Sequence, residues 1–519
     1  MVMTKTLKEI DFGDVDAKNE ILKQLRSGSQ QFFESFSIPS TIELDDYFTG
    51  RKHFILGLKG TGKTALLRFI HKRIQDDKSL SELILFKSHV SEEDRQRLSN
   101  NSGYEIVSVE GVNTLVQDFK EAWKWFIYQR IAKLIYDSGN RSKVAKKIFA
   151  ITGTSEDTLF QSIGALFSKV SSGSINLSVE AVGIAVELGA DISLSDDGSS
   201  NSVAGINRVL SALLNDLEYD RSIYVLFDEL ELFYETVEQF DRDRRIIRDL
   251  VYAISSINAE SAENARMLFL ISSLRTEVLN SVLELGHEIG RDIDDYGDRL
   301  DWSSAKDSEE HPLLMLVGKK ISSSTGVDQK HVWSTFFPDT IHGQPYYKFI
   351  LNSSYYRPRD IIRLLRVAKN FRNSDQKFSQ VHFDETAREY SKQTWLEVTE
   401  ELLASYSTTE VSALQRLFLG FHTRFFVEDI EYRISTKYRS DRDVQKIKES
   451  RGIPVILNDL YRIGILGNDF IGHAGSKKRN IHRWVFRGNT TLNISERMAV
   501  HKSLWKHLSL IQGSVSNKR

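Results

Sequence analysis

The sequence predicts an α/β fold built on a parallel β-sheet, on the basis of three observations. Short continuous apolar runs recur along the chain, as strands buried on both faces of a parallel sheet require. Segments with helical periodicity separate these runs. A glycine-rich segment joins the first run to the helix that follows it. The strands expected on this basis are His53–Leu56, Ile223–Phe227 and a third within Ala265–Leu279.

The glycine-rich segment, Gly57–Thr64, has the spacing G-x-x-x-x-G-K-[ST] of a phosphate-binding loop, or P-loop. Glycines let the backbone N–H groups of such a loop point inward around the β-phosphate. Lys63 can reach the β- and γ-phosphates, and the Thr64 hydroxyl can ligate Mg²⁺. The helix that begins at Lys63 adds its positive N-terminal end to the same anion. The residues expected to contact the nucleotide are Gly57, Lys59, Gly60, Thr61, Gly62, Lys63, Thr64 and Ala65.

The second strand ends in two acidic residues, Asp228 and Glu229. In P-loop ATPases the strand beside the P-loop strand ends in such a pair. The aspartate then holds Mg²⁺ through water, and the glutamate polarises the attacking water. We therefore expect Asp228 to serve the metal, Glu229 to act as the general base, and this strand to neighbour the P-loop strand. A solvated strand end without a catalytic role is the alternative.

The third strand ends in Ser272, Ser273 and Arg275. A polar residue at the tip of the strand next to the acidic pair is well placed to contact the γ-phosphate or its water, and we expect Ser272 to do so. Arg275 is expected to reach the phosphate or a neighbouring subunit. Short polar strand ends are common, so a purely structural role for these residues stays open.

Composition narrows the class of protein. The chain of 519 residues is 40% hydrophobic and 27% charged, which is typical of a globular protein with several domains. No stretch is long and apolar enough for a transmembrane helix, and residues 1–14 lack the apolar region of a secretory signal. The absence of cysteine excludes disulfides, thiol catalysis and cysteine-ligated zinc. These observations predict a cytoplasmic protein without a membrane partner.

Two further segments have predictable local structure. Asn113–Asp137 has helical periodicity and is expected to form one amphipathic helix, capped by Asn113. Ser174–Ser195 alternates strictly, with a slip near Ala181–Gly183 that indicates a bulge or a tight turn in a β-hairpin. Because Ser/Gly-rich pieces flank this hairpin, we expect it to belong, with a helix, to an insertion over about residues 140–205. It either pairs with another chain or is self-contained.

Five segments resemble AAA+/STAND-type ATPases of the origin-recognition-like branch, and more narrowly the bacterial FunZ- or KAP-like P-loop ATPases. They are FGDVDAKNE from Phe12, GLKGTGKT from Gly57, YVLFDELE from Tyr224, FLISSLR from Phe269 and YYRPRDIIRLL from Tyr355. The resemblance implies a three-layer P-loop core over residues 1–300, a helical lid over 301–405 and a basic winged-helix domain over 406–519. Relatives often sit among genes for phage defence or DNA maintenance.

The last of these segments looks like the Asn-Pro-Arg sensor-2 element, with Arg357 in place of asparagine. The resemblance implies that Arg359 contacts the γ-phosphate. Arg357 and Arg359 flank Pro358 at the positive end of a helix, where cations are unfavourable unless an anion lies nearby. We therefore expect ATP to close the lid, or to bridge subunits, through Arg359 and Arg275. No N-K-x-D motif for guanine is present, so the expected cofactors are ATP and Mg²⁺.

Charge is divided unevenly along the chain. Residues 421–519 carry nineteen Lys and Arg against nine Asp and Glu, a net charge of +10, whereas the rest carries 50 against 62, a net charge of −12. Lys477, Lys478 and Arg479 lie at the expected wing tip, and basic residues also crowd the segment 439–451. These charges predict salt-sensitive binding of duplex DNA. Two functions remain: an ATPase switch or motor on DNA, and an ATP-gated scaffold that oligomerises and holds a protein effector.

Overall fold

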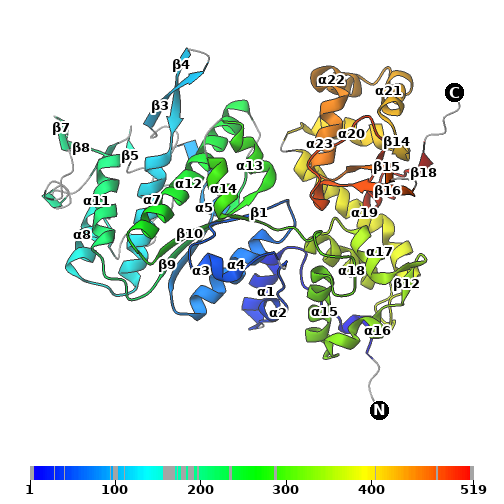
Figure 1. Cartoon of the computed structure of the whole chain (residues 1–519), viewed down its shortest axis with the longest axis horizontal. Coiled ribbons are helices and arrows are strands. Elements are labelled where there is room, and N and C mark those ends of the chain that lie inside the picture. Colours follow the sequence, from blue (N-terminus) through cyan, green and yellow to red (C-terminus); the bar gives the residue numbers. More distant parts are fainter. Residues whose placement is uncertain are drawn as a thin grey trace. The chain divides into compact units, whose positions relative to one another are not determined.

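The computed structural model of the chain describes residues 5–28, 30–39, 41–93, 95–96, 103–109, 112–155, 170–171, 174–176, 183–184, 187, 192–195, 198–232, 236–285, 289–403, 405–474 and 477–514. The chain folds as two compact units (Figure 1). The sheet unit comprises Ile42–Leu58 and Lys63–Leu300, and the helical unit comprises Met1–Thr41, Lys59–Gly62 and Asp301–Arg519. Four residues of the glycine-rich loop thus group with the helical unit. No helix in the described ranges combines the length and apolar character needed to cross a bilayer.

The sheet unit contains a five-stranded sheet in which every neighbouring pair is parallel. The order across the sheet is β11-β1-β10-β9-β2. All four residues of β1 are buried, as are six of the eight residues of β10. The predicted α/β class with a parallel sheet is therefore confirmed. The strands are β1 (Phe54–Gly57), β2 (Leu80–Leu85), β9 (Ile223–Leu230), β10 (Leu268–Arg275) and β11 (Gly297–Arg299).

One expectation about this sheet is wrong, because the acidic strand β9 does not neighbour β1. Strand β10 lies between them, pairing Ser272 with Phe54 of β1 and Ile271 with Leu226 of β9. The physical reason is that a continuous apolar run marks a strand as interior but does not order the interior strands. The expectation that β10 neighbours the acidic strand is confirmed, and its polar end lies between the ends of β1 and β9.

Helices α4 (Lys63–Asp76), α7 (Lys120–Asp137) and α12 (Val237–Glu263) pack on the strands of this sheet. Helix α7 also contacts α8 (Lys143–Thr152) and α11 (Val203–Asn215). Apolar side chains of α7, α8, α11 and α12 join those of the strands in one buried core. This core holds the ends of β1, β9 and β10 in a fixed arrangement.

The helix expected to start at Asn113 begins at Lys120 instead. Residues Val112–Asp118 form strand β4, which pairs antiparallel with β3 (Gly103–Val109). Leu115 fits the apolar face of the expected helix, but a short segment that fits a helical face also fits a strand. Cross-strand hydrogen bonding with β3 therefore decides its structure, and periodicity does not.

The segment expected to form a bulged hairpin is divided among several elements. Ser174–Asn176 is strand β6, and Ile192–Ser195 is strand β7. Both belong to a small antiparallel sheet of order β5-β6-β8-β7, with β5 at Val170–Ser171 and β8 at Gly198–Ser202. Gly183, at the expected bulge or tight turn, is helical, and Ile184 is also helical and not extended, so the expected strand is wrong at Ile184. The remaining residues of the expected hairpin lie outside the described ones.

The helical unit carries Pro358 in the first turn of α18, as predicted. Helix α18 packs against α19, and α19 also contacts the short helix η5 (Lys502–Leu504) near the C-terminus. Its elements up to residue 402 include α1 (Ala17–Ser27), α15 (Pro312–Thr325), α16 (Val332–Phe336), α17 (Tyr346–Ser353), α18 (Pro358–Phe371) and α19 (Gln380–Leu402).

The C-terminal part of the helical unit, residues 405–514, combines helices with an antiparallel sheet. Strand β15 follows helix α23, and its residues Asn468–Ala474 pair antiparallel with β16. Strand β14 and helix α22 were not expected. The elements are α20 (Thr408–Phe418), β14 (His422–Phe425), α21 (Val427–Thr436), α22 (Arg442–Arg451), α23 (Ile453–Arg462), β15 (Leu466–Ala474), β16 (Lys477–Arg483), β17 (Met498–Val500), η5 (Lys502–Leu504) and β18 (Ile511–Ser514).

Candidate functional site

The glycine-rich loop joins the end of β1 to the start of α4. Gly57 ends β1, Lys63 begins α4, and Thr64 and Ala65 follow in the first turn of that helix. Gly60 and Gly62 have φ angles of 80° and 99°, in the left-handed region that glycine enters without steric cost. The segment therefore has the strand, loop and helix context that a phosphate-binding loop needs.

Lys63 is buried within this loop. Its ammonium group donates hydrogen bonds to the carbonyl oxygens of Gly57, at 2.9 Å, and Leu58, at 2.8 Å. Both acceptors are neutral carbonyls of the same segment. A phosphate would offer a charged acceptor, and hydrogen bonds between two charged groups are stronger than those to neutral carbonyls. The lysine is thus held where an anion can compete for it.

Asp228 lies at the end of β9 and is 2% exposed. Its carboxylate accepts a hydrogen bond from the Ser273 hydroxyl. Burial raises the pKa of Asp228 above its ordinary value, although hydrogen bonds from Ser273, the Glu229 backbone and Thr64 oppose the rise. The structure therefore brings together Asp228 and Thr64, the two residues that the sequence predicts as metal ligands.

Two buried oxygens at these strand ends, Asp228 Oδ2 and Ser272 Oγ, have no hydrogen-bond partner among the described residues. Buried polar atoms are almost always paired, so each unpaired one calls for an explanation such as a bound ion or water. Carboxylate and hydroxyl oxygens are the ligands that Mg²⁺ prefers. The donor set at the ends of β9 and β10 therefore fits a magnesium ion.

Glu229 sits in a β-bulge. Phe227 and Leu230 of β9 pair with Ser272 and Leu274 of β10, so two residues of β9 face one residue of β10. Glu229 has a φ angle of 60°, which is uncommon for any residue other than glycine and costs about 1 kcal/mol or more. Strained backbone of this kind gathers at functional sites, where the surrounding structure maintains it.

The Glu229 carboxylate accepts a hydrogen bond of 2.8 Å from the Ser88 hydroxyl. Ser88 belongs to the one-turn helix α5 (Phe86–His89), which directly follows β2. The bulge thus turns Glu229 toward the end of the adjacent strand β2, while Asp228 points to β10. The two neighbouring carboxylates therefore have different surroundings, as different chemical roles require.

Arg275, at the end of β10, forms an ion pair with Glu231, which also accepts a hydrogen bond of 2.8 Å from Lys87. Arg275 is therefore paired within the sheet unit itself. The contact with a phosphate or with a neighbouring subunit that the sequence predicts for Arg275 stays a prediction.

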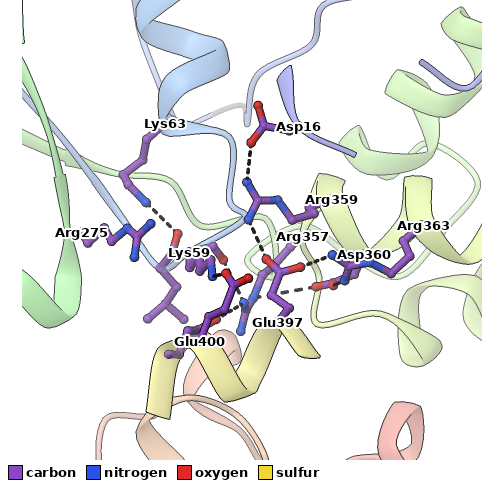
Figure 2. A network of polar contacts seen from close by, with 12 residues as sticks. Asp16, Lys59, Lys63, Arg275, Arg357, Arg359, Asp360, Arg363, Glu397 and Glu400 are labelled. Atoms are coloured by element: carbon purple, nitrogen blue, oxygen red, sulfur yellow. Dashed lines mark hydrogen bonds and ion pairs between the residues drawn. The ribbon is translucent and has the colours of Figure 1, made fainter. Parts of the chain in front are cut away.

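The loop residues Lys59–Gly62 belong to the helical unit and contact its side chains (Figure 2). The Lys59 ammonium lies 2.6 Å from a carboxylate oxygen of Glu400. Arg357, which caps the start of α18, donates a hydrogen bond of 2.8 Å to the Lys59 carbonyl and one of 3.3 Å to Glu401. Thr61 accepts a 2.8 Å hydrogen bond from the indole of Trp302. Side chains of the helical unit thus surround the loop backbone.

Arg359 donates a hydrogen bond of 2.6 Å to Glu397 and one of 3.4 Å to Asp16 (Figure 2). Glu397 also binds Arg363, which donates a 3.0 Å hydrogen bond to Asp360. Burial raises the pKa of Glu397, but the guanidinium groups of Arg359 and Arg363 outweigh it and lower the pKa to about 2. Glu397 is therefore a carboxylate held firmly between two cations.

The acidic partners of these cations were missed in the sequence analysis. Glu397, Glu400 and Glu401 are spaced so that they share one face of α19, because residues three and four apart lie side by side on a helix. The spacing was visible in the sequence. Their partners Lys59 and Arg357 are about 340 and 40 residues away in the chain, and spacing says nothing about contacts at such separations.

The basic residues of the C-terminal part are only partly described. Lys477, Lys478 and Arg479 begin β16, directly after the connection from β15, and their side chains lie outside the described part of the chain. On or beside α22, Arg439, Arg442 and Lys446 are exposed. By contrast, Arg451 forms an ion pair of 3.1 Å with Glu410 and covers the ring of Tyr406, so it is a structural residue.

No cluster of three or more histidine, cysteine, aspartate or glutamate side chains that could hold a metal ion occurs within the described ranges. A Mg²⁺ ion at Thr64 and Asp228 would therefore depend on further oxygens. Mg²⁺ is commonly bound by one or two carboxylates together with the phosphates of a substrate. The residues present fit a magnesium ion that arrives with a nucleotide.

Part of the helical unit matches a known protein family, and the whole chain is similar to a known protein. Residues 311–399 match the family model of the FunZ-associated C-terminal helical domain, and this range runs from α15 into α19. Over 530 residues the chain is 23% identical to the "Putative transposon gamma-delta 80.3 kDa protein" of Escherichia coli (strain K12), with 99% of this chain and 69% of that protein covered. The match of residues 311–399 agrees with the FunZ part of the resemblance that the sequence carries.

Proposed function

We propose that the chain binds Mg-ATP at Gly57–Thr64 and hydrolyses it. The observation that carries this proposal is the arrangement at the strand ends of the sheet unit. Lys63 lies at the start of α4, Asp228 interacts with the Thr64 hydroxyl, and Glu229 sits in a strained bulge next to them. This is the set of a phosphate-binding cation, metal ligands and a base that phosphoryl transfer to water requires.

Each residue of the set has a proposed role. The loop N–H groups and Lys63 bind the β- and γ-phosphates, and Thr64 and Asp228 hold Mg²⁺. Glu229 accepts a proton from the attacking water, and Ser272 orients that water. ATP supplies the phosphoryl group, and Mg²⁺ neutralises its charge. The Ser88 hydroxyl donates a hydrogen bond to the Glu229 carboxylate and would orient it for this role.

Calorimetric titration of the full chain with Mg-ATP tests nucleotide binding. Lys63→Ala removes the ammonium group that neutralises the phosphates, so the affinity should fall by about tenfold to a hundredfold, since hydrogen bonds to charged groups contribute about 1.5–3 kcal/mol. Lys52→Ala is a matched control, because Lys52 interacts with Asp298 and with backbone carbonyls outside the loop. Unchanged affinity in Lys63→Ala would refute the nucleotide assignment.

We further propose that ATP binding drives a switch or motor on duplex DNA, in phage defence or DNA maintenance. The net charge of +10 over residues 421–519 and the exposed Arg439, Arg442 and Lys446 support DNA binding. The helices α20, α21 and α23 followed by β15 and β16 have the order of a winged-helix domain. The relative named as a transposon protein supports a connection with mobile DNA.

A gel-shift assay with duplex DNA at low salt, with and without ATP, tests the DNA part of the proposal. We expect a complex whose affinity falls steeply as salt rises, because phosphate contacts release counterions. The absence of any complex would favour the rival function, an ATP-gated scaffold that oligomerises and holds a protein effector. This alternative function retains the proposed ATPase site and differs only in that the protein does not bind DNA.

A further inference from the structure

The C-terminal half of α19 has two faces with different contacts. On one face Trp395, Val398 and Leu402 belong to the apolar core of the C-terminal part, and the Trp395 ring stacks on His507 with centroids 5.7 Å apart. On the other face are the three carboxylates Glu397, Glu400 and Glu401. One rigid helix therefore joins the core of residues 405–514 to the cations around the glycine-rich loop.

Two of the cations bound by these carboxylates, Lys59 and Arg359, are residues that the sequence analysis predicts to contact the nucleotide. Lys59 belongs to the loop itself and pairs with Glu400. Arg357 holds the Lys59 carbonyl and pairs with Glu401 at 3.3 Å. Arg359, the residue that the family resemblance assigns to the γ-phosphate, pairs with Glu397. Each of the three cations is thus paired with a carboxylate of α19.

The approach between the loop and the start of α18 is close. A methyl group added at Gly60 would lie 3.4 Å from side-chain atoms of both Arg357 and Arg359. Arg357 is 3% exposed, and its Nη2 has no hydrogen-bond partner among the described residues. A buried guanidinium with an unused donor beside a phosphate-binding motif favours an anion at this position.

We propose that Glu397, Glu400 and Glu401 form a carboxylate clasp that a nucleoside triphosphate displaces from Lys59, Arg357 and Arg359, and that α19 passes this displacement to the C-terminal part. The inference rests on the proposed function. A ligand shifts such an equilibrium only by its difference in affinity for the two states. The clasp meets this condition, because its closed state occupies the cations that the triphosphate needs. Nucleotide binding is therefore weakened by the clasp and strengthened when the clasp is removed.

The test uses the full chain, calorimetric titration with Mg-ATP, and hydrogen–deuterium exchange. Glu400→Gln removes the negative charge of a side chain that is 70% exposed, so folding should stay intact. ATP affinity should rise about twofold to fivefold, the scale of an exposed ion pair. Glu401→Gln removes the negative charge of a side chain that is 4% exposed, and a larger rise in ATP affinity of about tenfold is expected. Glu385→Gln, at an exposed position of the same helix, is the control and should bind ATP like the wild type.

Hydrogen–deuterium exchange tests whether displacement of the clasp changes the contacts between α19 and the C-terminal part. In the wild type, ATP should raise exchange over residues 395–402 and 502–508, which pack together. In Glu400→Gln, exchange there should already be raised without ATP. Wild-type binding of ATP with no change in affinity in either variant, or with no change in exchange, would overturn the clasp and leave the proposed function standing. Failure of the wild type to bind ATP would overturn both.

Discussion

Replacing Glu397 by glutamine should lower the free energy of unfolding at pH 7 by up to about 3 kcal/mol. The Glu397 residue is 9% exposed and pairs with Arg359 and Arg363. Burial raises its pKa, but the two guanidinium groups lower it from 4.5 to about 2. A depression of about 2.5 pKa units corresponds to about 3 kcal/mol, at about 1.4 kcal/mol per unit. Glutamine keeps the shape of the side chain and removes the charge that produces this stabilisation.

The pH dependence of the effect follows from the direction of the shift. The pKa in the folded state lies below the unfolded value, so the stabilisation is complete well above pH 4.5 and is lost as pH falls toward 2. At about pH 4, linkage gives a loss of about 1 kcal/mol in the wild type and none in Glu397→Gln at this position. The difference between the two proteins should therefore shrink by about that amount.

Urea unfolding at pH 7 and at pH 4, followed by tryptophan fluorescence, measures both quantities. Glu385→Gln serves as the control, because an exposed substitution away from such contacts changes stability by about 0.5 kcal/mol or less. Equal stability of wild type and Glu397→Gln at pH 7 would refute the reasoning. So would a difference that stays constant between the two pH values, because the stabilisation would then not come from the carboxylate charge.

Three further predictions concern the proposed activity. Glu229→Gln should bind ATP like the wild type but hydrolyse it at least about 100-fold more slowly, the scale of losing a general base, and turnover at the native rate would contradict this assignment. Asp228→Asn should raise the Mg²⁺ concentration needed for half-maximal turnover by about tenfold to a hundredfold, as measured by metal titration; an unchanged Mg²⁺ requirement would remove Asp228 from the metal site. Replacing Lys477, Lys478 and Arg479 with glutamate should weaken DNA binding and reduce the slope of log affinity against log salt by up to about three, with ATP affinity unchanged; an unchanged slope would place DNA elsewhere.

The parallel sheet was predictable because its strands carry their evidence locally. His53–Leu56 and Ile223–Phe227 are continuous apolar runs, and the loop after the first run has a fixed residue spacing. The order of the strands was not predictable, because β1, β9 and β10 are all buried and have similar apolar sequences. Strand β4 was misread for a related reason, because Leu115 fits the apolar face of a helix and only its pairing partner β3 favours the strand.

Part of the candidate site was likewise predictable from the sequence, and part was not. Lys63, Thr64, Asp228 and Glu229 follow strands or open a helix, so their position at the carboxyl edge of the sheet follows from the sequence. The left-handed backbone of Glu229 does not, because it arises from the two-against-one pairing of β9 with β10. The contacts of the α19 carboxylates do not follow from the sequence either. Their spacing predicts that they share one face of a helix, but it does not predict which residues that face contacts.

The backbone of Glu229 also bears on what evolution and engineering can do at this position. A φ angle of 60° is strained for glutamate and relaxed for glycine. Glycine at residue 229 would therefore relieve the backbone strain and remove the proposed base. The same substitution would raise thermal stability and lower the rate of ATP hydrolysis. Selection for heat resistance alone would drift toward inactive chains here. A stabilised yet active form must gain its stability elsewhere, for example in the packing of α7 and α11, where no proposed chemistry depends on strain.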